Sequence, residues 1–148
     1  MEWEKLSFKI RAAVEEAIDT ATECGHSDIT SLHMLQALLH QDGGVLTGIL
    51  DHVGAEPEQL HAYLESAVEQ LPRVADSAGA AGLGQEFHAL VRRGWEVAHK
   101  FGDDHLAPEH LVLAMVETEA DQGGAILREQ GVSVFVATCF LFSTRKTQ

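Results

Sequence analysis

Apolar residues recur at helical spacing along most of the chain, and the pattern occurs twice. Between about Leu6 and Cys24 they fall at steps of three or four residues, which places them on one face of a helix. The same pattern returns 77 residues later. The two stripes consist of Ile10, Val14, Ile18 and Ala21, and of Phe87, Val91, Trp95 and Ala98. The chain is therefore predicted to contain two copies of one helical unit.

The segment after each of these helices repeats at the same offset. In each copy a glycine, Gly25 or Gly102, precedes a short loop and a new helix. A glycine at this place suits the left-handed cap that ends a helix. Thr30 can cap the next helix of the first copy through its hydroxyl, whereas Pro108 stands at the first helical position in the second copy. The two copies thus predict one arrangement with two different helix starts.

Further stripes of apolar residues predict the remaining helices of each copy. In the first copy we expect helices over 31–41, over 45–50 and from about 57 to 71, the last opened by a proline with flanking acids. In the second copy the third helix is expected near 124–130. The predicted fold is all-α, with two pseudo-twofold repeats of four helices each. Within one domain, 1–148, the predicted parts are repeat one 4–71, linker 72–84 and repeat two 85–143.

The last segment, 134–143, fits an eighth helix poorly. It is apolar almost all round, rich in aromatic and β-branched residues, and lacks acids in its first turn. Three alternatives follow: a helix buried on every side, a strand, or a surface that binds something. If Phe135, Phe140, Leu141 and Phe142 are uncovered, we expect self-association.

Composition narrows the function classes. The net charge of −13 argues against binding to nucleic acid, which needs clustered Lys and Arg. The chain has no apolar run of about 18 residues and an acidic start, so we expect a soluble, cytoplasmic protein with no membrane partner. Cys24 and Cys139 lie far apart without a Cys-x-x-Cys motif, and we expect them to pack rather than react.

The sequence contains few candidates for catalytic, metal-binding or phosphate-binding residues. The nine histidines do not show the tight spacing of a zinc site, so we expect no metal and no cofactor. His33 and His110 occupy equivalent first-turn positions, and we expect a ring nitrogen of each to bond the backbone. Neither a nucleophile motif nor a Gly-x-x-x-x-Gly-Lys-Ser/Thr phosphate loop is present, so the chain is not expected to be an enzyme.

Several stretches together resemble the amino-terminal domain of Clp-type AAA+ unfoldases, most closely that of the ClpB disaggregase. They are Lys5-Leu6-Ser7, Leu32-His33-Met34-Leu35-Gln36-Ala37-Leu38-Leu39 with Gln41-Asp42-Gly43-Gly44, Leu71-Pro72-Arg73-Val74, and Gly102-Asp103-Asp104 with Glu109. The resemblance covers about residues 4 to 133 and implies a double repeat of four helices. The chain departs from the family in its Ala- and Gly-rich linker, in its tail, and at Leu32, where the second copy keeps Glu109.

The resemblance implies a domain that binds unfolded or aggregated polypeptide and delivers it to a Clp AAA+ ring, in cis or in trans. Ser7, Asp103 and Glu109 match the family's substrate-binding surface and are the candidate substrate-binding residues. Glu109 can instead simply stabilise the positive end of its helix. The alternative function is a stand-alone adaptor or regulator that binds the Clp machinery. Recognition of phosphorylated arginine, as in ClpC-like relatives, needs paired glutamates, and only Glu109 is present.

Two copies packed about a pseudo-twofold axis are expected to leave a groove between their matching loop–helix junctions. We expect extended apolar segments to bind there weakly, with Asp103 and Glu109 on the rim. Acids on the rim would favour segments that also carry Lys or Arg.

Overall fold

The structure, a computed structural model, describes residues 3–74 and 79–145, with the backbone alone at 144 and 145. Part of the predicted linker, 75–78, and the chain ends, 1–2 and 146–148, lie outside the described residues. The described residues form η1 (Trp3–Lys5), α1 (Phe8–Cys24), α2 (Ser31–Leu39), α3 (Val45–Val53), α4 (Pro57–Glu69), α5 (Gly84–Lys100), α6 (Pro108–Glu117), α7 (Gln122–Glu129) and α8 (Val134–Arg145). The predicted all-α fold is confirmed. The boundaries of the two repeats and of the linker stay predictions.

The predicted helix ends also match the structure. Gly25 and Gly102 take the left-handed conformation, with φ of 77° and 73°. The Thr30 hydroxyl accepts a hydrogen bond of 3.2 Å from the Leu32 backbone N–H, and Pro108 is the first residue of α6. Because these local signals are strong, the sequence alone predicts where the central helices begin.

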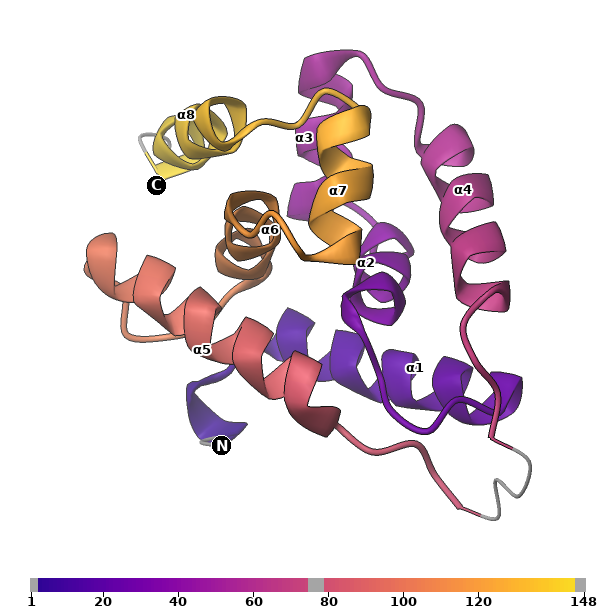
Figure 1. Cartoon of the computed structure of the whole chain (residues 1–148). Coiled ribbons are helices and arrows are strands. Elements are labelled where there is room, and N and C mark those ends of the chain that lie inside the picture. The colour runs from indigo at the N-terminus through magenta and orange to yellow at the C-terminus, as the bar shows by residue number, and fades with distance from the viewer. Residues whose placement is uncertain (1–2, 75–78, 146–148) are drawn as a thin grey trace.

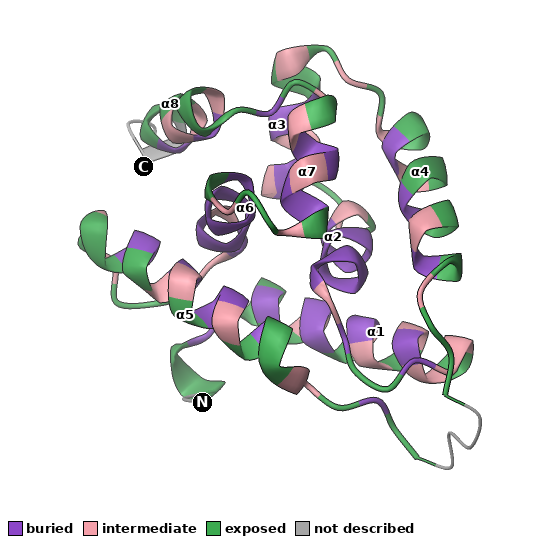
Figure 2. Ribbon diagram, in the orientation of Figure 1, coloured by how far each residue is buried: buried purple, intermediate pink, exposed green. Residues whose placement is uncertain are grey.

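Helices α2 and α6 lie at the centre of the molecule (Figure 1). Helix α2 packs against α1 and α4 of its own copy and against α7 of the other. Helix α6 packs in the same way against α5, α8 and α3. Each central helix therefore contacts the third helix of the opposite copy, so the two copies share one hydrophobic core (Figure 2).

This central position changes the expected pattern of burial. Every residue of α2 from Ser31 to Leu38 is buried, although the sequence suggests one apolar face. Conversely, Ile18 and Trp95, equivalent members of the two predicted stripes, are only partly buried at the edge of the core. The periodicity predicts which face of a helix turns inward but not how many neighbours surround it.

Short extended segments join the copies at two matching places. The Ile29 N–H donates to the Gly82 carbonyl at 3.0 Å, and the Leu106 N–H donates to the Lys5 carbonyl at 2.9 Å. Ile29 and Leu106 are equivalent residues of the two loops, and both are fully buried. The segment before the first helix of each copy therefore lies against the loop of the other copy.

Segment 134–143 belongs to helix α8, which excludes the strand alternative. The helix is not buried on every side, because Ala137 and Leu141 face the core while Phe135 is 76% and Phe142 53% exposed. Cys139, on the same helix, is exposed rather than packed, whereas Cys24 packs against the core. Among the described helices none alone is long and apolar enough to cross a membrane; α7 and α8 meet the length and composition test only as a pair bent by 83°.

Candidate functional site

Ser7 stands where the first copy meets the loop of the second. Its hydroxyl accepts a 3.2 Å hydrogen bond from the Ile10 N–H and so caps α1. Its backbone N–H donates to the Leu106 carbonyl at 2.8 Å. Two neighbouring aromatic residues are exposed, Phe8 largely, at 79%, and Trp3 in part, at 41%.

Asp103 is held by a buried histidine of the same loop–helix junction. The Ala107 N–H donates to Nδ1 of His110 at 2.9 Å, so the neutral ring carries its proton on Nε2. That Nε2–H donates to the Asp103 carboxylate at 2.7 Å. Burial lowers the pKa of His110, although the charge of Glu109 opposes the shift. The expected backbone bond of His110 is confirmed, and Asp103 is fixed in place by it.

Glu109 is the second residue of α6 and is only partly exposed. Burial raises the pKa of its carboxyl, while the charges of His110 and Lys9 and a backbone hydrogen bond oppose that rise. The bridge between Leu6 and Leu106 brings the start of α1, with Ser7, against the loop that leads to Glu109. The three predicted residues therefore lie around one junction between the copies.

The first copy contains an equivalent junction with different chemistry. At the 77-residue offset Ser7, Asp103 and Glu109 correspond to Gly84, His26 and Leu32. Nδ1 of His33 accepts from the Thr30 N–H at 2.8 Å, and its Nε2 lies 3.0 Å from Nδ1 of His26.

Burial and the neighbouring His26 lower the pKa of His33 to about 4.

The described residues contain no group of three or more His, Cys, Asp or Glu side chains that could hold a metal ion.

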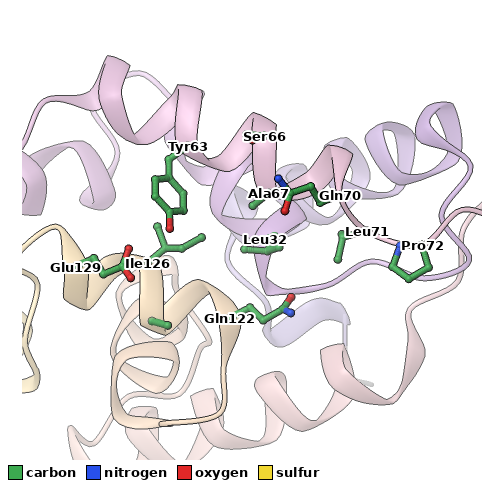
Figure 3. A pocket seen from close by; sticks show the side chains of 11 residues that line it. Leu32, Tyr63, Ser66, Ala67, Gln70, Leu71, Pro72, Gln122, Ile126 and Glu129 are labelled. Atoms are coloured by element: carbon green, nitrogen blue, oxygen red, sulfur yellow. The ribbon is translucent and has the colours of Figure 1, made fainter.

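A hollow of about 660 Å³ opens at this first-copy junction, between α4 and α7 (Figure 3). Its lining comes from both copies: Leu32, Tyr63, Ser66, Ala67, Gln70, Leu71, Pro72, Gln122, Ala125, Ile126 and Glu129. Asp103 and Glu109 do not line it, so the predicted rim residues belong to the opposite junction. The sequence suggests a groove between the copies but does not indicate which of two equivalent junctions is open.

The family model of the Clp repeat (R) N-terminal domain matches residues 5–130 of this chain. Among curated proteins, the chaperone protein ClpB of Pseudomonas putida is 31% identical over 133 residues, which is 90% of this chain. The chain spans 16% of the length of that relative.

Solved structures share the fold. The N-terminal domain of the ClpV1 ATPase from Escherichia coli has a TM-score of 0.80 and 25% identity, covering 91% of this chain and 82% of that one. The Hsp104 N-terminal domain from Candida albicans has a TM-score of 0.80 at 16% identity, covering 97% and 93%. A ClpV N-domain in complex with a VipB peptide has a TM-score of 0.64 at 19% identity, covering 77% and 69%.

Proposed function

Because this chain belongs to the family of Clp repeat N-terminal domains, we propose that it recruits unfolded or aggregated polypeptide and delivers it to a ClpB-like AAA+ ring. Its role in this proposal is binding without catalysis, in the cytoplasm. The ring stands in cis or in trans, since the chain matches only 16% of the ClpB relative. The similar ClpV N-domain solved with a VipB peptide supports a peptide as the kind of ligand.

The observation that carries the proposal is the exposed Phe8 beside Ser7, at the junction that contains the two acids. A side chain that is 79% exposed gains little from folding but can bury apolar area against a bound chain. Asp103 and Glu109 at the same junction supply negative charge for a segment that also carries Lys or Arg. A receptor that hands its cargo to a motor should bind weakly, at about micromolar or weaker.

Fluorescence anisotropy of a labelled, permanently unfolded polypeptide tests the proposal. Phe8→Ser should weaken binding about tenfold, because the apolar anchor is lost. The matched control is Phe135→Ser, which removes an equally exposed aromatic from α8 and should leave binding unchanged.

The acids are tested separately. Glu109→Gln should weaken binding a few-fold, whereas Glu117→Gln, at the exposed end of the same helix, should not. Wild-type affinity in both Phe8→Ser and Glu109→Gln would exclude this junction as the binding surface.

A further inference from the structure

The two junctions between the copies are equivalent by sequence, but an aromatic ring packs on the third helix at one of them, and a hollow lies beside that helix at the other. At the first of these, Phe140 of α8 packs so tightly on α3 that a Cβ added to Gly48 would lie 2.9 Å from the tip of its ring. The equivalent residues at the hollow between α4 and α7 are Tyr63 and Ala125. An alanine therefore stands where Gly48 meets the ring of Phe140, so an aromatic ring on α4 would have to shift to pack on α7 in the same way.

Tyr63 instead lines the hollow between α4 and α7. Its side chain is 46% exposed, and its hydroxyl faces Glu129 of α7, whose carboxylate raises the pKa of Tyr63 (Figure 3). Beneath it, Leu32 and Ile126 line the hollow from opposite copies, although only 2% of Leu32 and 7% of Ile126 is exposed. Leu32 is the residue that replaces the acid of the second copy, so the change from Glu to Leu makes this junction apolar where its counterpart is charged.

A second hollow, of about 420 Å³, adjoins the first at Leu71 and Pro72 and is lined in part by His26. His33 accepts the Thr30 N–H on Nδ1, so its own proton lies on Nε2 and is donated to Nδ1 of His26. The proton of His26 must then lie on Nε2. That atom is buried in a residue only 4% exposed, and among the described residues it has no hydrogen-bond partner. A backbone carbonyl of a bound chain is the kind of acceptor it lacks.

The charged side chains that line the two hollows are acidic, although the charge of Arg73, which follows Pro72, reaches His26 and lowers its pKa. Glu129 lines the first hollow, and Asp28 and Glu86 line the second, at the other side of Leu71 and Pro72. No Lys or Arg occurs among the described residues that line either hollow. An apolar centre between acidic ends fits a segment with apolar side chains in the middle and basic residues at its ends.

We infer that the hollow between α4 and α7 is a second polypeptide-binding site, for an apolar partner segment flanked by Lys or Arg, separate from the Ser7 junction. The site allows one domain to hold two chains, or one chain at two places. It does not depend on the function proposed for Phe8 and Glu109, because no residue is shared between the two surfaces.

A synthetic peptide with alternating Leu and Ala in its centre and two lysines at each end is a suitable probe. In an amide-shift titration it should move signals of α4 and α7, including those of Tyr63 and Ile126. Ser66→Trp should fill the opening and reduce affinity at least tenfold. The matched control is Ser143→Trp, at the equivalent exposed position of α8, which should bind normally.

Glu129→Lys should also weaken the basic peptide about tenfold, whereas Glu15→Lys, an exposed change of equal charge on α1, should not. Ser66→Trp should still bind the unfolded polypeptide through Phe8, so the two sites fail independently. The inference is overturned if Ser66→Trp and Glu129→Lys both bind the peptide like the wild type. It is also overturned if glutamates in place of the lysines leave affinity unchanged, or if the shifts lie only around Ser7 and Glu109.

Discussion

At the scale of single residues, the start of each central helix depends on one histidine. His33 and His110 accept a backbone N–H on Nδ1, as the sequence predicts from their equivalent positions. The sequence does not show what their other nitrogens contact. His26 and Asp103, seven residues earlier, reach them only because a left-handed glycine turns the chain back after the preceding helix. One copy therefore holds a neutral histidine pair and the other a histidine–carboxylate pair.

The histidine pair predicts that stability falls in mild acid. His33 has an ordinary pKa of 6.5 in the unfolded chain and about 4 in the folded one, so between these values only the unfolded chain takes up the proton. The free energy of unfolding should be highest above pH 6.5 and decrease as the pH falls towards 4. The loss due to His33 should be on the order of 2–3 kcal/mol, measured by urea denaturation across this range.

His33→Gln separates titration from capping. Glutamine at this position can still make the reciprocal hydrogen bonds of a capping box with Thr30, but it cannot take up a proton. The variant should be within about 1 kcal/mol of the wild type at pH 7 and should lose less stability on acidification. An equally steep loss in both proteins would show that His33 does not cause it.

At the scale of elements, the second copy differs from the first where α7 begins. The double glycine Gly123-Gly124 is displaced relative to Gly43-Gly44 and lies inside α7. There the helix approaches both central helices: the Gly123 N–H donates to the Ser31 hydroxyl at 3.1 Å, and Gly124 lies against the backbone of Met115. The sequence shows the displacement but not its cause, which is the contact of α7 with α2 and α6.

Gly124→Ala should therefore be strongly destabilising. A methyl group there would overlap the Met115 carbonyl oxygen, and backbone cannot move aside as a flexible side chain can. We expect a loss of about 3 kcal/mol in the free energy of unfolding, near the upper end for overpacked sites. Gly79→Ala, where the added methyl meets nothing within 4 Å, should change stability by less than about 0.5 kcal/mol. Similar melts for the two variants would contradict the close helix contact.

Helix α8 should cause weak self-association. Phe135 and Phe142 are exposed, while Ala137 and Leu141 anchor the helix, so a substitution is a cleaner test than removal of the helix. Phe135→Ser should lower the average mass seen by light scattering at high protein concentration without loss of helicity. A wild-type protein that stays monomeric at all concentrations would refute the prediction.

At the scale of the whole molecule, the internal repeat predicts most of the fold. Matching apolar positions and helix caps are local signals, and they identify the helices and their order. The repeat does not predict that Phe140 packs against Gly48 while its counterpart Tyr63 lines a hollow, because these contacts join helices far apart in sequence. The candidate site is predicted through family resemblance. The second hollow is found only in three dimensions.

The net charge of −13 predicts that salt affects how fast the molecule binds a basic peptide. Association with a basic, apolar peptide should slow as salt is added, because exposed charges are screened over about 10 Å at 0.1 M. Much of the affinity should remain, because apolar contacts are not screened. Stopped-flow fluorescence measures the rate. An association rate that does not depend on salt would show that the acidic residues do not accelerate the encounter with the peptide.

The most direct test of the central claim is a map of backbone amide shifts during titration with a permanently unfolded polypeptide. We predict that the shifts cluster around Ser7, Asp103 and Glu109 and saturate at about micromolar or higher concentrations. The contradicting result is an absence of shifts with any unfolded chain while a purified Clp ring binds this domain tightly. That outcome would contradict the role of substrate receptor and favour that of an adaptor or regulator of the ring.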